Sequence, residues 1–203
     1  MGDAAWTRLP RAIRQRFGKR VSRGASVAYQ GKVTDMRMNC AGRLLAFLAR
    51  AMGAPLPYDL SSVGRAAVVV VTEDSATNGQ FWIRQYGKAK GFPQTVCSSK
   101  RFAGPTGLEE YIGYGIGMAL RLEATPRALF FLSAGYFIKL GSLRLALPRL
   151  LSPGQLVVGH EDSGDGAFRF SLRLEHPVFG LMIAQSALFR DAEIVGGAHD
   201  RLH

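Results

Sequence analysis

Hydrophobic and polar side chains alternate along much of the chain, and a period of two is typical of β-strands. The clearest alternation covers residues 168–175, where four large apolar residues are separated by Arg, Ser, Arg and Glu. Residues 155–161 precede it across a short loop rich in Asp and Gly, which predicts an antiparallel hairpin. Residues 65–73, with four consecutive valines, and residues 80–87 predict a second hairpin.

Residues 111–123 have the most unusual pattern of all the predicted strands. Large apolar residues occupy one parity, whereas Gly113, Gly115, Gly117 and Ala119 occupy the other. Because successive side chains of a strand point to opposite faces, one face would be apolar and the other nearly bare. Such a strand allows a sheet to bend sharply, and we expect the concave surface to form a cavity.

Four more segments are predicted to be strands. Residues 94–102 are polar on both faces, which favours an edge strand, and residues 128–140 are apolar on both parities, which favours a central one. Residues 25–37 and 179–189 complete the set. Because few helices separate these strands, parallel crossovers are disfavoured and the sheet is predicted to be mainly antiparallel.

Helical periodicity is confined to the first quarter of the chain. Residues 9–17 carry an apolar side chain at every fourth position, as in a short amphipathic helix. Residues 40–52 predict a longer helix, with Asn39 as its N-cap and Gly53 ending it.

These elements together predict an α+β fold. We expect a strongly curved, mainly antiparallel sheet of about eight or nine strands that forms a half-open β-barrel. Two N-terminal helices accompany it, and the second is expected to plug or cover one side. Residues 1–190 are predicted to form a single domain, and residues 191–203 a disordered tail.

Composition and charge add limits on the protein class. A chain of 203 residues with 47% hydrophobic content can bury a core without disulfides or metal. Cys40 and Cys97 lack metal-type spacing, and no apolar leader precedes them, so we expect a reduced, cytoplasmic protein. Eleven Lys or Arg against two Asp up to residue 50 leave +9 of the net charge of +11 in this segment. A basic segment of this kind is either a solvated face or a contact surface for nucleic acid or anionic lipid.

No motif predicts catalysis. The chain has no Gly-x-Ser-x-Gly sequence and no Cys with a His close in sequence, so we lean against an enzyme. The glycines of residues 113–117 resemble a dinucleotide loop in spacing only, because no helix follows them, and no cofactor is predicted. Asp162 and Asp165 fit a turn better than a calcium loop, so no metal is predicted either.

Several polar and apolar residues are candidate ligand contacts. Glu110, at the entrance to the apolar strand, is expected beside Arg84, with Glu109 and Lys100 as further candidates, and either a ligand site or a structural ion pair explains them. A second group is predicted to meet at the open mouth of the sheet or to line its concave face: His160, His176, Tyr114, Ile116 and Met118. For the two histidines a structural role is favoured over a ligand role.

Several short motifs occur in an order that resembles one family. They are Leu9-Pro10, Trp82-Ile-Arg84, Gly107-Leu-Glu-Glu110, Leu147 to Pro153 and His176 to Gly180. Together they resemble domain of unknown function family 4166, an uncharacterised bacterial domain found alone or C-terminal to saccharopine-dehydrogenase-like domains. The resemblance extends from about Leu9 to Phe189. It implies a saccharopine-dehydrogenase-like partner, but no activity and no site residues.

Three hypotheses for function follow. The first is a non-catalytic module that binds an apolar or amphipathic, lipid-like small molecule in the concave face of the sheet. The alternative is an accessory or catalytic domain of redox metabolism that works with a dinucleotide-binding partner. The third is peripheral contact with an anionic membrane through the basic N-terminal segment, with nucleic acid the less favoured target.

Overall fold

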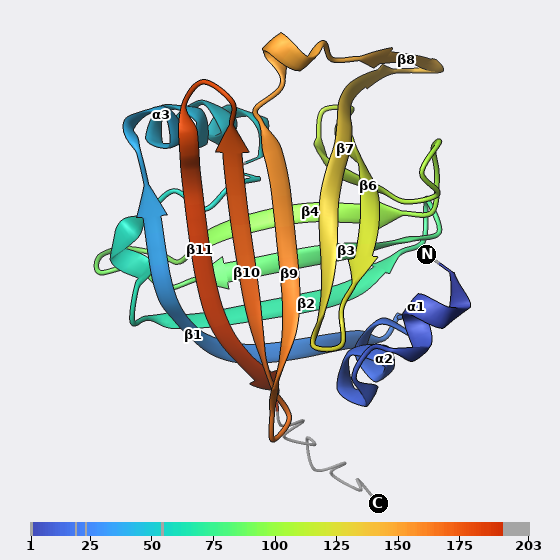
Figure 1. Ribbon diagram of the computed structural model, residues 1–203. Coiled ribbons are helices and arrows are strands. Elements are labelled where there is room, and N and C mark those ends of the chain that lie inside the picture. Colours follow the sequence, from blue (N-terminus) through green and yellow to red (C-terminus); the bar gives the residue numbers. More distant parts are fainter. Residues whose placement is uncertain (1, 19, 23, 54, 193–203) are drawn as a thin grey trace, which may run out of the picture.

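Ten antiparallel strands close into a barrel in the computed structural model, which describes residues 2–18, 20–22, 24–53 and 55–192 (Figure 1). The strand order round the barrel follows the chain, with β6 pairing with β7 and β11 pairing with β1. An eleventh strand, β8 (Leu143–Ala146), pairs with β7 outside this ring. The ten barrel strands are β1 (Ser26–Met38), β2 (Ala66–Asp74), β3 (Gly79–Tyr86), β4 (Gln94–Arg101), β5 (Glu109–Gly113), β6 (Ile116–Ala124), β7 (Ala128–Leu140), β9 (Gln155–Gly164), β10 (Ala167–His176) and β11 (Gly180–Asp191).

The prediction of a half-open barrel with eight or nine strands was therefore wrong in both respects. The glycine-rich segment 111–123 is a hairpin and not one strand, because Tyr114 and Gly115 form a two-residue turn between β5 and β6. Both residues adopt positive φ angles, 50° and 75°, as a tight type I′ hairpin turn requires. The extra reversal supplies the strand whose pairing with β7 closes the ring.

The bare track of this hairpin is filled by a neighbour. A Cβ atom on Gly117 would lie 2.5 Å from the ring of Phe137 on β7, so only glycine leaves room for that ring. Phe137 is fully buried, and the guanidinium of Arg144 on β8 lies over its ring, 3.6 Å from the centroid. The prediction that a side-chain-poor face would admit a neighbour is confirmed, but the neighbour lies on the outer face of the barrel.

Strand β4 is another correction, because it pairs with β3 over residues 94–100 and with β5 over residues 99–101, so it lies within the ring and not at the edge of a sheet. Its polar side chains Ser98 and Lys100 are buried by other charged residues inside the barrel, which explains a polar pattern without solvent exposure. The other predicted pairings are confirmed. Hairpins join β2 to β3 and β9 to β10, and β7 is a central strand with β6, β8 and β9 as partners.

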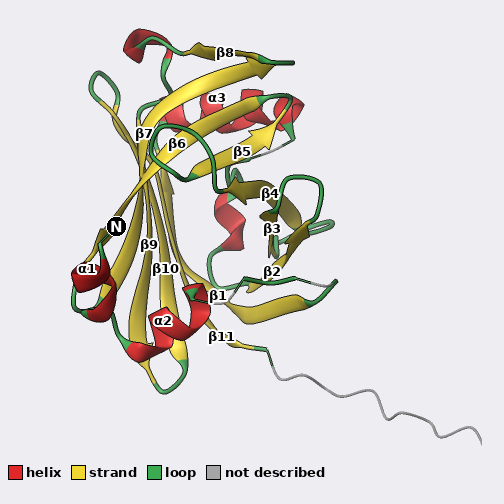
Figure 2. Cartoon of the chain, turned by 90° about the vertical axis from the view of Figure 1, so that its right-hand side faces the viewer, coloured by secondary structure: helices red, strands yellow, loops and turns green. Residues whose placement is uncertain are grey.

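Helices cover the two ends of the barrel (Figures 1 and 2). At one end lie α1 (Asp3–Thr7), which the sequence did not predict, and α2 (Arg11–Phe17). Ile13 of α2 is fully buried, and the ring of Phe17 stacks on Trp82 with centroids 6.0 Å apart. This end of the barrel is therefore plugged by α2.

The opposite end carries α3 (Cys40–Ala49) followed by the 3-10 turn η1 (Arg50–Met52), in agreement with the prediction for residues 40–52. The side chain of Asn39 accepts a hydrogen bond from the Gly42 backbone N–H, as expected of an N-cap. Short 3-10 turns η2 (Leu60–Ser62) and η3 (Arg149–Leu151) complete the described elements, and η3 lies with β8 at the same end as α3 (Figure 2).

The predicted tail is largely outside the described residues, which end at Ala192 after β11. Within the described ranges, none of the helices has the length and apolar character needed to cross a bilayer.

Candidate functional site

A cavity of about 670 Å³ lies inside the barrel and opens at the end that carries α3. This volume is within the range of roughly 300–1,000 Å³ that is usual for small-molecule sites. Most of the wall is apolar and comes from α3, η3 and the inward faces of the strands. The large apolar residues of the wall are Leu44, Leu45, Leu48, Met52, Leu56, Val96, Ile112, Ile116, Met118, Ile138, Leu147, Leu150, Leu151, Leu156, Val158, Phe170, Leu172, Leu174, Phe179 and Met182.

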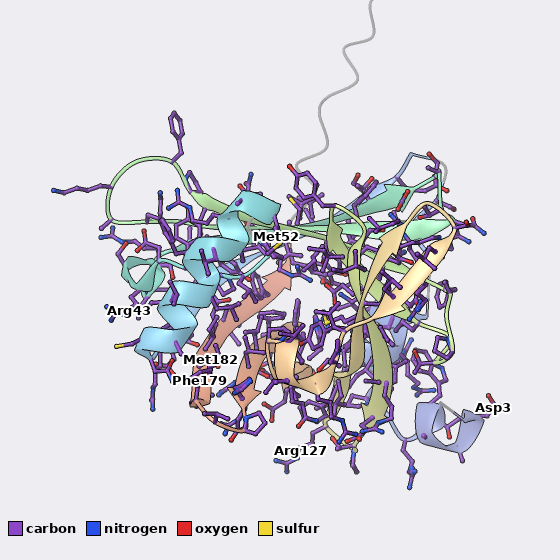
Figure 3. The ribbon with its side chains drawn as sticks, turned by 90° about the horizontal axis from the view of Figure 1, so that it is seen from above. Asp3, Arg43, Met52, Arg127, Phe179 and Met182 are labelled. Atoms are coloured by element: carbon purple, nitrogen blue, oxygen red, sulfur yellow. The ribbon has the colours of Figure 1, made fainter. Side chains whose placement is uncertain are left out.

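Helix α3 forms the rim of the cavity in an unusual way, because it packs on the barrel through its small residues. A Cβ atom on Gly42 would lie 2.0 Å from the backbone oxygen of Met182 on β11, so the helix approaches the strand directly. Its large apolar residues are left uncovered, with Leu44 61% and Leu48 55% exposed at the cavity mouth. Figure 3 shows α3 lying across this end beside Met182 and Phe179. Leu44, Phe47 and Leu48 thus form an apolar stripe along α3 that no part of the described chain buries.

A charged cluster lies at the other end of the cavity. Arg84 on β3, Ser98 and Lys100 on β4, and Glu110 on β5 are all buried, and all but Lys100 line the cavity. Oε1 of Glu110 accepts a hydrogen bond from Oγ of Ser98 at 2.5 Å and lies 3.1 Å from Nζ of Lys100. Nη2 of Arg84 is 3.5 Å from the same oxygen, and its Nη1 donates to Oγ of Ser98 at 3.2 Å.

The cluster also separates the cavity from the plugged end. Nζ of Lys100 lies 4.8 Å from the ring centroid of Trp82, which in turn stacks on Phe17 of α2. Arg84 and Glu110 thus form the polar floor of an otherwise apolar cavity.

The electrostatics of this floor follow from burial opposed by opposite charge. Burial alone would raise the pKa of Glu110, but Lys100, Arg84 and the hydrogen bond from Ser98 outweigh it and lower that pKa to about 2. Burial lowers the pKa of Lys100 to about 8, and Arg84 acts in the same direction, while Glu110 opposes the shift. Glu110 and Lys100 are therefore both charged at neutral pH.

The two predicted histidines do not meet at the mouth, contrary to expectation. His160 on β9 pairs with Phe170 on β10. Phe170 precedes His176 by six residues, so the two histidines are separated by about 20 Å along the strands. His160 is buried in an aromatic cluster that includes Phe17, at a centroid distance of 4.9 Å, and it does not line the cavity. Burial lowers the pKa of His160 well below its usual value, with Lys100 the next cause, so its ring is neutral.

The remaining candidates fall on both sides of the barrel wall. Ile116 and Met118 line the cavity, as predicted, and His176 lies at its rim, where its ring stacks on Phe179 at 4.9 Å. Tyr114 is outside the cavity, 77% exposed at the tip of the β5–β6 turn. The glycines on either side of Tyr114 allow a turn with positive φ angles, so Tyr114 occupies a turn position and not a strand face.

Glu109 and Glu110 are neighbours that serve opposite faces of β5. Glu109 is fully buried on the outer side, where it forms an ion pair with Arg144 and accepts a hydrogen bond from the Tyr111 hydroxyl at 3.0 Å. This pair is structural, because it is covered by β8 and does not line the cavity. The sequence prediction missed Ser98. Val96, Ser98 and Lys100 lie on the same face of their strand, and this shared face could have identified Ser98 if the strand had not been taken for an edge strand.

Comparison with known proteins gives a family but no relative with an assigned activity. The profile of the family described as "Domain of unknown function (DUF4166)" matches residues 9–189. The chain belongs to this family. No curated protein and no solved structure matches the chain significantly. Because the DUF4166 match begins before α2 and ends within β11, all the residues of the cavity wall belong to the family domain.

In the described part of the chain, this DUF4166 cavity has neither a metal-type cluster nor a dinucleotide loop. Among the described residues, no three His, Cys, Asp or Glu side chains are grouped to hold a metal ion. Residues 113–117 form a hairpin turn and lead into a strand, so they present no helix N-terminus to a pyrophosphate. The features that remain are a large apolar wall, an open mouth and one charged floor.

Proposed function

We propose that this DUF4166 domain binds an amphipathic, mainly apolar small molecule inside its barrel. The apolar part of the ligand would lie against α3 and the strand walls, and its polar end at Arg84, Ser98 and Glu110. The observation that carries the proposal is the combination of uncovered leucines on α3 with an apolar cavity that has the Arg84–Glu110 ion pair on its floor.

The energetic argument rests on burial of apolar surface. Each methylene group moved from water into an apolar site gains about 0.8 kcal/mol, and a cavity wall made of leucine, methionine and phenylalanine offers such a site. Leu44 and Leu48 would lose their own exposed surface to the same ligand, which adds to the gain. A polar ligand of the same size would forfeit both contributions and would leave its own polar groups unpaired against the wall.

Direct binding with a matched pair of variants tests the proposal. A fluorescent fatty-acid analogue is titrated into the wild-type protein and into two tryptophan variants. Met118→Trp enlarges a side chain inside the cavity, whereas the control Phe81→Trp enlarges one outside it. We expect saturable binding to the wild type and to Phe81→Trp, and at least tenfold weaker binding to Met118→Trp. Solvent extraction of the purified protein and mass spectrometry should also release a bound amphiphile.

A second variant keeps the test decisive if Met118→Trp does not fold. Leu48→Trp enlarges an exposed residue at the mouth, where the helix tolerates added volume, and it should slow entry of the analogue. Circular dichroism and thermal melting establish that each variant is folded. Absence of saturable binding to the wild type, or equal affinity in the variant with the filled cavity, would overturn the proposal.

A further inference from the structure

The charges on the cavity floor do not cancel. Arg84 and Lys100 contribute two positive charges, and Glu110 contributes one negative charge. No other acidic side chain in the described part of the chain forms an ion pair with either cation. His160 behind the floor is neutral, so it changes nothing in this balance. The floor therefore holds one excess positive charge in a buried position, which is costly unless a counter-ion reaches it.

The excess charge is directed at the cavity through Arg84. Lys100 lies closest to Glu110, at 3.1 Å, and is absent from the cavity wall, so it is committed to that carboxylate. Arg84 is held less closely, at 3.5 Å, and it lines the cavity together with Ser98. A guanidinium carries five N–H donors in a fork that matches an acidic group, and only Nη1 and Nη2 have partners here.

From this imbalance we propose that the polar end of the ligand is a singly charged acid, a carboxylate or a sulfonate on a single apolar chain, bound to Arg84 beside Ser98. The inference rests on the proposed function and specifies its ligand class. An acid with one charge neutralises the floor. An alcohol leaves the excess charge in place, and an amine would double it.

Three ligands with the same twelve-carbon chain separate these cases: dodecanoate, dodecanol and dodecylamine. In competition with the fluorescent analogue at pH 7, wild-type protein should prefer dodecanoate over dodecanol by at least tenfold, and dodecylamine should bind most weakly. In Arg84→Met the acid should lose at least tenfold, while dodecanol changes little. Arg121→Met, which removes an exposed arginine on β6, should leave all three affinities unchanged.

The outcomes separate this inference from the proposed function. If dodecanoate and dodecanol bind the wild type equally, the acid inference is wrong and the amphiphile site stands. If neither binds, both proposals fail together. The comparison between ligands needs only the wild type, so it remains decisive even if Arg84→Met does not fold.

A second, independent observation concerns the outer surface at the cavity mouth. Large apolar residues from three separate segments are exposed at this one end: Phe47 on α3, Leu150 on η3, which is 87% exposed, and Phe179 before β11. Figures 1 and 2 show α3, η3 and the β10–β11 turn at this end. Single exposed apolar residues are ordinary, but their concentration round one opening marks a contact surface.

The charges at this end indicate what that surface contacts. The segments that form it, residues 38–53, 55–63, 112–117, 138–155 and 175–181, contain five Lys or Arg and two acidic residues, Asp59 and Glu175. Glu175 pairs with Arg173 at 2.8 Å, and Arg144 pairs with Glu109, which leaves four cations against Asp59 and a net charge of +3 on this surface. Apolar side chains surrounded by Lys and Arg are typical of proteins that rest on anionic lipid.

We infer that the mouth end of the barrel, defined by these segments, binds peripherally to the surface of an anionic bilayer. The apolar side chains would enter the interfacial region while Arg43, Arg50 and Arg149 contact lipid phosphates. This surface shares Arg43 and Arg50 with the basic N-terminal segment of the sequence prediction. Helix α2 of that segment, however, lies at the opposite end of the barrel (Figure 1), where Arg16 packs over the ring of Phe168 at 3.7 Å. An open mouth held against lipid would also place the cavity next to a source of amphiphiles.

Vesicle flotation tests this inference with two lipid compositions, phosphatidylcholine alone and phosphatidylcholine mixed with phosphatidylglycerol. Wild-type protein should float with the mixed vesicles only, and less so as salt rises. The double variant Leu150→Ser, Leu151→Ser and the double variant Arg43→Glu, Arg149→Glu should each lose at least tenfold in bound fraction. The control is Phe92→Ser, because Phe92 is 90% exposed on the β3–β4 loop, which extends sideways from the barrel wall in Figure 1.

Light scattering on the same protein samples tests the alternative that a second copy of the chain covers this surface in a dimer. No flotation with mixed vesicles, an equal loss in Phe92→Ser, or a stable dimer that the Leu150→Ser, Leu151→Ser variant dissociates would each overturn the inference. Flotation that survives both double variants would overturn it as well.

Discussion

Removing the charge of Glu110 is the most informative perturbation of the barrel interior. Glu110→Gln keeps the size of the side chain but leaves Arg84 and Lys100 buried without a counter-charge. The pKa of Glu110 is lowered from 4.5 to about 2, and at about 1.4 kcal/mol per pKa unit this corresponds to roughly 3 kcal/mol of stabilisation by the charged form. Breaking a buried ion pair by removing one partner usually costs about 3–5 kcal/mol, which agrees.

The effect has a defined pH dependence. Because the pKa of Glu110 is lower in the folded than in the unfolded state, its stabilisation is fully present above about pH 4.5 and is lost as the pH falls toward 2. The free energy of unfolding of Glu110→Gln should therefore lie about 3 kcal/mol below that of the wild type at pH 7. The gap should shrink steadily below pH 4.5.

Urea denaturation followed by fluorescence at a series of pH values measures both quantities. Glu161→Gln is the matched control, because Glu161 faces Arg169 at 3.9 Å in an exposed pair that should contribute at most about 1 kcal/mol. Adding Lys100→Met to Glu110→Gln should recover part of the loss, because only Arg84 then remains charged. A Glu110→Gln variant within 0.5 kcal/mol of the wild type, or a gap that stays constant down to pH 3, would refute this account of the buried cluster.

The remaining predictions concern helix α3 and ligand binding. Gly42→Ala should lower stability by about 1–3 kcal/mol in urea denaturation, because its Cβ would lie 2.0 Å from the Met182 oxygen, and a gain of stability would show that α3 does not pack through Gly42. The affinity for dodecanesulfonate should fall by up to about tenfold per pH unit above pH 8, where Lys100 loses its proton and only the Arg84–Glu110 pair stays charged; calorimetry that shows the same fall for dodecanol would contradict this. In a series of unbranched acids, each added methylene should tighten binding about fourfold until the cavity is full, and a flat series would exclude an apolar wall contact.

Local features of the barrel were predictable wherever they depend only on the residues of one strand or helix and its adjacent turn. The β9–β10 and β2–β3 hairpins and the N-cap of α3 follow from alternation, from short Gly and Asp loops, and from Asn39. The β5–β6 turn was missed because Tyr114, at its first position, is a residue that rarely adopts positive φ. That single error removed one strand from the count and left the barrel open.

The site was predictable only in part, for a related reason. Arg84 and Glu110 were recognised as a pair and do meet, and Ile116 and Met118 do line the cavity. The position of His160 was wrong because its distance from His176 depends on the hairpin register and not on sequence proximity. Tyr114 was wrong because its parity was counted through a turn.

By itself the sequence determined which segments are strands and helices, where most hairpins reverse and how α3 begins, since each depends on contacts within a few residues. The tertiary structure alone decided that β1 meets β11, that β6 meets β7, and that three neighbouring strands direct two cations and one carboxylate inward. These features depend on ring closure between segments far apart in the chain, and on which parity of each strand faces inward. A periodic pattern is the same for both faces of a strand, so only the closed barrel assigns a floor, a mouth and an excess charge to its interior.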